Sequence, residues 1–164
     1  MNPYLKQYQK NQIETATPER ILIMLYDGAI QYLNIARNEM MVEGRKDIQK
    51  IHNNIVSAEK IITEFKCTLN MEIGGDVANN LYELYSYFYR RLVEANIKKD
   101  VAPIDEVLWH LKELKSTWLQ AIDIAQKERV NKEVQVGEDE YISDSSDDDF
   151  EDVEEDQYEK AYRD

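Results

Sequence analysis

The feature that most constrains how this chain folds is a run of apolar residues between positions 48 and 69. These residues recur at alternating steps of three and four, and they are Ile48, Ile51, Ile55, Ala58, Ile62, Phe65 and Leu69. Because an α-helix completes a turn about every 3.6 residues, this spacing places all of them on one face of a helix. A helix with one apolar face needs other elements to cover that face, so the pattern predicts a helical fold with a shared core.

Three further segments carry apolar stripes at helical spacing. The first begins near Thr17-Pro18, a capping residue followed by a proline that the first helical position tolerates, and Gly44 is placed to end it. Asp76 is placed to cap the next of these segments, and Pro103 opens the last one. The stripe residues are Leu22, Leu25, Ala29, Leu33, Ala36 and Met40; Val77, Leu81, Leu84, Phe88, Leu92 and Ala95; and Ile104, Val107, Leu111, Leu114, Trp118, Ala121 and Ala125.

The connections between these segments are short, so sequential helices are expected to run antiparallel. The chain has only five glycines and three prolines, which favours a few long helices over the many turns of an all-β fold. We therefore predict an all-α protein with an antiparallel up-down four-helix bundle over residues 17–128. An N-terminal cap segment, 1–16, precedes the bundle, and an acidic C-terminal tail, 129–164, is expected to be disordered.

The net charge of −13 is concentrated at the C-terminal end of the chain. Residues 131–164 hold 15 acidic and 3 basic residues, a net charge of −12, which leaves 18 acidic and 17 basic residues, a net charge of −1, for residues 1–130. A nearly neutral bundle without a basic stripe argues against binding to nucleic acid or to anionic lipid. The longest apolar run is only Ile21 to Tyr26, so we expect no signal peptide, no membrane insertion and a location in the cytoplasm.

The sequence shows no machinery for catalysis. It has no glycine-rich phosphate loop, no nucleophile elbow and no HExxH motif, and Cys67 is its single cysteine. His52 and His110 are the only histidines, and neither belongs to the paired Glu-x-x-His motifs of a di-iron bundle. We therefore predict that the protein is not an enzyme and holds neither a cofactor nor a metal ion.

The helical segments have more apolar surface than a four-helix bundle buries. The side chains from Ile21 to Tyr26 point all the way round the first helix, and Tyr82, Tyr85, Tyr87 and Tyr89 surround the stripe of the third. Such surplus is typical of a groove that binds amphipathic helices from another protein. The cap segment carries apolar residues of its own, and we hypothesise that it is a lid that the partner displaces; these residues are Tyr4, Leu5, Tyr8 and Ile13.

Several motifs in this order and spacing resemble the flagellar secretion chaperone family FliS. They are Asn2-Pro3-Tyr4, Tyr8-Gln9, Thr15-Ala16-Thr17-Pro18-Glu19, Leu25-Tyr26-Asp27-Gly28 and Tyr87-Phe88-Tyr89-Arg90-Arg91-Leu92-Val93-Glu94-Ala95-Asn96, and the match continues to Thr117-Trp118. The resemblance implies a cytoplasmic chaperone that binds the C-terminal segment of flagellin and prevents its premature polymerisation. It also implies that the chaperone helps to present flagellin to the flagellar export gate, a second expected partner.

The resemblance and the surplus apolar surface together indicate a set of partner-binding residues. Tyr4, Tyr8 and Ile13 fall in the family's N-terminal cap. The other candidates lie on the first and third helices and are Leu22, Leu25, Tyr26, Gly28, Tyr85, Tyr89, Arg90, Arg91, Glu94 and Asn96. The charged members of this set fit salt bridges within the protein as well as they fit contacts with a partner.

The acidic tail departs from the family pattern, because family members end soon after the fourth helix. The tail is compatible with a solubility device, a self-masking segment or a docking element for a second partner. An alternative function is therefore a regulatory adaptor whose acidic tail binds a basic partner. Such a complex should weaken steeply with salt, whereas helices buried in a groove should respond little.

Overall fold

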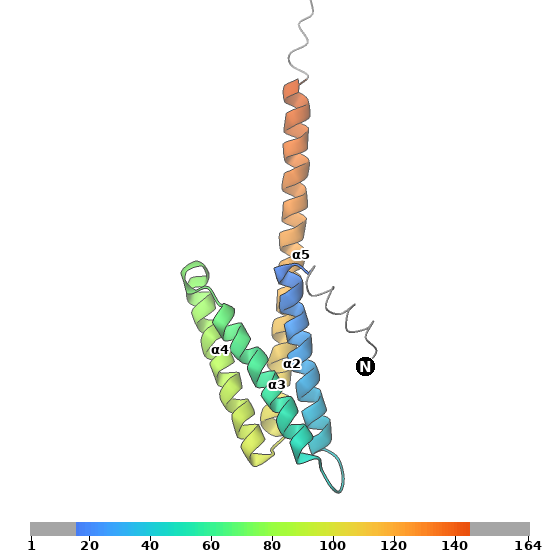
Figure 1. Ribbon diagram of the computed structural model, residues 1–164. Helices are drawn as coiled ribbons and strands as arrows, with labels where there is room; N and C mark the ends of the chain where they lie inside the picture. The colour runs from blue at the N-terminus through green and yellow to red at the C-terminus, as the bar shows by residue number, and fades with distance from the viewer. Residues whose placement is uncertain (1–15, 145–164) are drawn as a thin grey trace, which may run out of the picture. The chain divides into compact units, whose positions relative to one another are not determined.

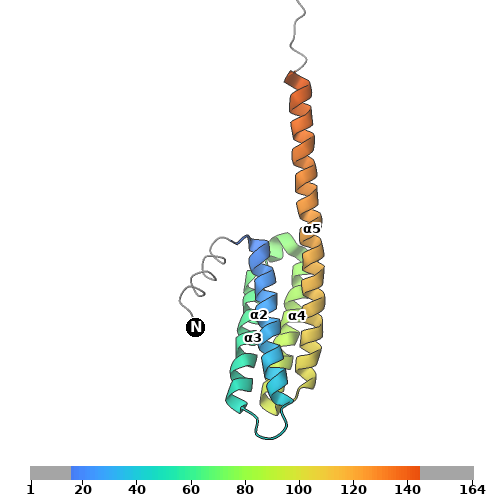
Figure 2. The same cartoon turned by 90° about the vertical axis from the view of Figure 1, so that its right-hand side faces the viewer.

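The computed structural model describes residues 16–144, with side chains described up to residue 135. It contains four α-helices, which are α2 (Pro18–Met40), α3 (Ile48–Thr68), α4 (Met71–Lys98) and α5 (Ala102–Asp144) (Figure 1). Sequential helices run in opposite directions, and α2 lies between α3 and the first part of α5 (Figures 1 and 2). The predicted all-α four-helix bundle is confirmed. Within the described part of the chain, no helix is both long and apolar enough to cross a membrane.

Side chains cap the starts of three helices. The Thr17 hydroxyl accepts a hydrogen bond from the Arg20 N–H at 3.2 Å, as the sequence predicted for α2. The start of α4 differs from the prediction, because Asn70 rather than Asp76 caps it. The first residues of α4 form a single helical turn, and the helix breaks at Gly75, where a φ of 50° and a ψ of −129° suit a residue without a side chain.

The core confirms the α3 stripe from Ile51 to Phe65, although Ile48 is exposed. In α2 and α4, however, a tyrosine occupies a core position that the prediction gave to the preceding leucine. Tyr26 and Tyr85 are buried, whereas Leu25 and Leu84 are only partly buried. The buried and partly buried stripes then alternate strictly in steps of three and four: Leu22, Tyr26, Ala29, Leu33, Ala36 and Met40 in α2, and Ala78, Leu81, Tyr85, Phe88, Leu92 and Ala95 in α4. Val77, predicted to be a core residue, is 65% exposed.

Burial in α5 decreases along the helix. Ile104, Val107 and Leu111 are fully buried, and Leu114 and Trp118 pack only partly against the core. The predicted stripe residues Ala121 and Ala125 are exposed. The helix continues to Asp144, past the predicted end of the bundle at residue 128, so residues 129–144 of the predicted tail are helical. The rest of that tail, 145–164, and residues 1–15 of the cap segment lie outside the described residues.

Candidate functional site

Two of the candidate site residues are buried tyrosines, Tyr26 on α2 and Tyr85 on α4, whose hydroxyls share a hydrogen bond. The hydroxyl oxygens of Tyr26 and Tyr85 are 2.6 Å apart, and the indole Nε1 of Trp118 donates to the Tyr26 oxygen at 3.0 Å. The ring of Phe65 packs against both tyrosines, with centroid distances of 4.6 Å to Tyr26 and 5.2 Å to Tyr85. These four residues, which we call the aromatic cluster, come from all four helices and therefore hold the bundle together at one level.

The surroundings of the two hydroxyls disfavour their ionisation. Burial raises the pKa of Tyr26, and the neighbouring hydroxyl of Tyr85 raises it further. Burial also raises the pKa of Tyr85. Both groups therefore hold their protons in the folded protein at pH values at which an unfolded tyrosine, with a pKa of about 10, loses its own.

This difference predicts a loss of stability in alkali. Because the folded pKa values lie above the unfolded one, the contribution is fully present below pH about 10 and is lost as the pH rises further. The Tyr26→Phe/Tyr85→Phe double variant should therefore lose less stability than the wild type between pH about 9 and 11, as measured by urea unfolding. Tyr32→Phe, at an exposed position, is the control. Parallel losses in the wild type and the double variant would contradict the prediction.

The motif Leu25-Tyr26-Asp27-Gly28 attaches α2 to its two neighbours. Asp27 forms a salt bridge with Lys115 of α5. Gly28 approaches α3 so closely that a β-carbon there would lie 3.3 Å from the Cδ1 atom of Ile61. Leu25 packs partly against the core, as does Leu22 one turn earlier. Every residue of this predicted partner-binding motif therefore has a contact within the bundle.

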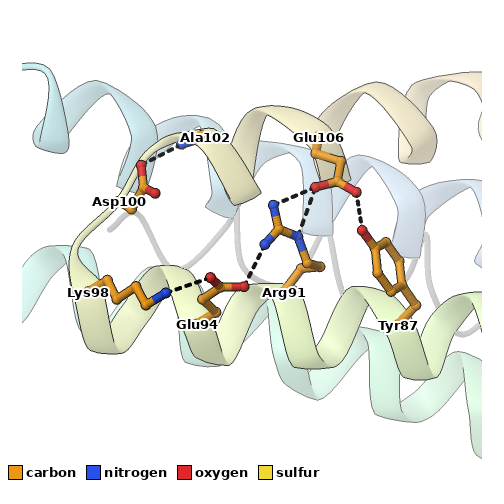
Figure 3. A network of polar contacts seen from close by, with 7 residues as sticks. All are labelled: Tyr87, Arg91, Glu94, Lys98, Asp100, Ala102 and Glu106. Atoms are coloured by element: carbon orange, nitrogen blue, oxygen red, sulfur yellow. Dashed lines mark hydrogen bonds and ion pairs between the residues drawn. The ribbon is translucent and has the colours of Figure 1, made fainter.

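A chain of polar contacts joins α4 to the start of α5 (Figure 3). Glu106 accepts hydrogen bonds from the Tyr87 hydroxyl and from Arg91, whose Nε atom lies 2.8 Å away. Arg91 also pairs with Glu94 on its own helix, and Glu94 pairs with Lys98 at 2.8 Å. The hydrogen bond from Tyr87 lowers the pKa of Glu106, and Arg91 lowers it further. Arg91 and Glu94 thus form salt bridges within the protein, one of the two roles that the sequence allows for them, and these salt bridges neither require nor preclude a contact with a partner.

The side of α4 opposite to Tyr87 and Arg91 faces α3 and carries two partly exposed tyrosine rings. Tyr82 and Tyr89 are each 39% exposed, and the Lys66 ammonium lies 4.7 Å from the centre of the Tyr82 ring. Further along the same side, the Asn96 amide and the His52 ring are hydrogen-bonded, with the amide nitrogen 3.0 Å from Nδ1. We call this surface between the two helices the α3–α4 groove. Tyr82, Tyr89, Asn96 and the α3 residues opposite them line it.

The predicted site residues thus fall into different environments. Tyr26 and Tyr85 are core residues, so it was wrong to count Tyr85 in the surplus apolar surface of α4. Tyr89 and Arg90 are exposed, and among the described residues Arg90 has no salt bridge. Tyr4, Tyr8 and Ile13 lie outside the described residues. The hydrogen bond of Trp118 and the role of Glu106 are not apparent from the sequence, because their partners lie on other helices. Among the described side chains, no group of three His, Cys, Asp or Glu residues is placed to hold a metal ion.

Comparisons with known proteins agree on one family. Residues 1–125 match the family model described as "Flagellar protein FliS". The chain is 35% identical over 128 residues to "Flagellar secretion chaperone FliS" of Bacillus subtilis (strain 168), an alignment that covers 78% of this chain and 92% of that one. It is 39% identical over 118 residues to "Flagellar secretion chaperone FliSB" of Pseudomonas aeruginosa, covering 70% and 91% of the two chains.

A relative from Salmonella typhimurium, "Flagellar secretion chaperone FliS", is 35% identical over 121 residues, which cover 71% of this chain and 87% of that one. A solved structure described as "Crystal structure of flagellar chaperone from bacteria" is similar in fold, with a TM-score of 0.60 and 21% sequence identity. That similarity covers 74% of this chain and 98% of the other. The family match ends at residue 125, within α5, so the remainder of this helix lies beyond it.

Proposed function

The chain belongs to the FliS family of flagellar secretion chaperones, and we propose that it binds the C-terminal segment of flagellin in the cytoplasm. By holding this segment, the chaperone prevents flagellin from polymerising prematurely and assists its delivery to the flagellar export gate. The observation that carries the proposal is the family match over residues 1–125, which covers the whole of α2, α3 and α4. Members of this family are chaperones rather than enzymes.

The surface chemistry of the bundle supports this proposal. The inward faces of the helices are filled by apolar side chains, and no polar or charged residue among those described is buried. Large apolar side chains nevertheless remain exposed on the helices, and they include Ile21, Tyr32, Tyr82, Tyr89 and Trp109. Amphipathic helices bind to such surfaces by laying their apolar side into the grooves of the bundle. A flagellin segment that orders on binding would gain apolar contacts there, and these contacts would oppose the loss of its conformational entropy.

The burial of the predicted site residues leads us to propose two roles for them. Tyr89, Arg90 and Asn96 are at the surface of α4, and we propose that they contact flagellin directly, with the partly buried Leu22 and Leu25 as further contacts. The other described members hold the helices in the arrangement that flagellin binds; these are Tyr26, Gly28, Tyr85, Arg91 and Glu94. The cap residues Tyr4, Tyr8 and Ile13 act, in this proposal, as the lid that flagellin displaces.

The test compares intact flagellin with flagellin that lacks its C-terminal segment, each titrated into the full-length chain by calorimetry. We expect the truncated protein to bind at least tenfold more weakly, because the proposed contacts with the bundle are all made by the missing segment. The isolated C-terminal segment is the matched control and should retain most of the affinity. Equal affinities of intact and truncated flagellin would contradict the proposal.

A further inference from the structure

The α3–α4 groove contains a carboxylate at a defined position. The contact between His52 and Asn96 and the contact between Lys66 and Tyr82 fix the antiparallel register of the two helices. Glu59 lies seven residues from both His52 and Lys66, so it shares their face of α3. The same register places Glu59 level with Tyr89 on α4, which itself lies seven residues from both Tyr82 and Asn96. The groove is therefore lined by three matched pairs, of which Glu59 and Tyr89 are the central one.

The carboxylate of Glu59 differs from the other groups in these pairs, because one of its oxygens is buried without a hydrogen-bond donor. Its Oε1 atom is shielded from solvent and, alone among the buried side-chain oxygens and nitrogens of the described residues, accepts no hydrogen bond. The side chain as a whole is only half-buried, so the carboxylate is still accessible to a partner. Burial raises the pKa of this carboxyl, and the nearby His52 offsets the effect only in part. A shielded acceptor without a donor destabilises the fold, and folded proteins retain few of them.

We propose that Glu59 is the polar recognition point of the α3–α4 groove and accepts a hydrogen bond from a lysine or arginine of the bound flagellin helix. The apolar side chains that flank this cation pack on the half-exposed rings of Tyr82 and Tyr89. The two residues that flank Glu59 on its face of α3 have contacts of their own, since Lys66 lies over Tyr82 and His52 is hydrogen-bonded to Asn96, so the carboxylate is left for the partner. This inference rests on the proposed function and adds to it the groove and the chemistry that select the client.

We expect the partner group to be a cation because the binding of a helix removes water from around the Glu59 carboxylate. A bound helix removes water from the groove, which strengthens the attraction between the carboxylate and an opposite charge. A helix with only apolar side chains at this level would instead seal the unpaired carboxylate away from water. Glu59 therefore rejects apolar helices that would otherwise fit the tyrosines, and it supplies specificity that the rings alone cannot provide.

The experiment measures the affinity of the flagellin C-terminal segment for the full-length wild type, Glu59→Gln and Glu64→Gln. Glu64 lies on the same helix but is exposed, so it is the matched control for the loss of one charge. We expect Glu59→Gln to bind about tenfold more weakly, while the free variant is at least as stable to urea as the wild type, because a shielded charge has been removed. Glu64→Gln should match the wild type in affinity.

A second arm identifies the cation. Each lysine and arginine of the flagellin segment is replaced in turn by methionine and tested against the wild type and Glu59→Gln. One replacement should weaken binding to the wild type about tenfold and have little further effect on Glu59→Gln. The inference is overturned if Glu59→Gln binds as tightly as the wild type, or if no replacement shows this coupling. Failure of the wild type itself to bind the segment would instead refute the proposed function.

Discussion

Replacing Phe65 with alanine is expected to lower the free energy of unfolding of this chaperone by about 3–5 kcal/mol. Phe65 is only 2% exposed, and its ring lies against both tyrosines of the aromatic cluster, Tyr26 and Tyr85. Removing the ring leaves a cavity at the level where all four helices meet, and the hydrogen-bonded tyrosines cannot both move to fill it without separating their hydroxyls.

Urea unfolding followed by circular dichroism measures this loss. The matched control is Tyr82→Ala, which removes an aromatic ring from a half-exposed position where a single contact with Lys66 is lost. That control should cost less than about 1 kcal/mol. A loss for Phe65→Ala as small as that of the control would mean that the aromatic cluster does not hold the helices together.

The sequence predicted the helices well because the information for them is local. The steps of three and four between Ile51 and Phe65 place these residues on one face whatever the rest of the chain does, and all of that stripe is buried. The Thr17 hydroxyl accepts its hydrogen bond from the N–H of a residue only three positions along the chain. The start of α4 was predicted less well, because Asn70 and Asp76 are both good capping residues and tertiary packing decides between them.

The errors in the core come from partners that are distant in sequence. A tyrosine at a stripe position is an unfavourable core residue unless its hydroxyl finds a hydrogen bond, and the oxygen that satisfies Tyr26 is that of Tyr85, 59 residues away. On α4 the helical spacing is compatible with either Leu84 or Tyr85, and the prediction placed Leu84 in the stripe. Only the packing of α2 against α4 and α5 resolves this choice.

The candidate site was predicted only in part for the same reason. The motifs identified Arg91 and Glu94, yet their partner Glu106 lies on another helix, and no local pattern indicates that contact. Glu59 was missed altogether, because a glutamate on a helix is ordinarily a solvated residue. Its significance depends on the absence of a donor around it among the described residues, which is a property of the packed bundle.

A substitution of Gly28 is expected to have the second large effect on folding stability. Replacing it with leucine is expected to cost about 2–3 kcal/mol of folding free energy, because a side chain at this position must fit between α2 and α3, where the Cδ1 atom of Ile61 already lies 3.3 Å from an added β-carbon. Gly28→Ala is the matched control. The terminal methyl of the partly exposed Ile61 can rotate away from a single added carbon, and alanine has a higher helix propensity than glycine. The unfolding free energy of Gly28→Ala should therefore stay within about 1 kcal/mol of that of the wild type.

Comparing the two substitutions separates a packing role of Gly28 from the partner-binding role that the sequence predicted. If the glycine serves the close approach of α2 to α3, Gly28→Ala keeps full affinity for flagellin, and Gly28→Leu loses stability and affinity together, since the grooves beside α2 change shape. If flagellin itself lies against Gly28, Gly28→Ala already weakens binding at unchanged stability. We expect the first result, because the contact with Ile61 leaves the glycine only partly accessible to a partner. Thermal unfolding and calorimetric titration of the same two variants distinguish these outcomes.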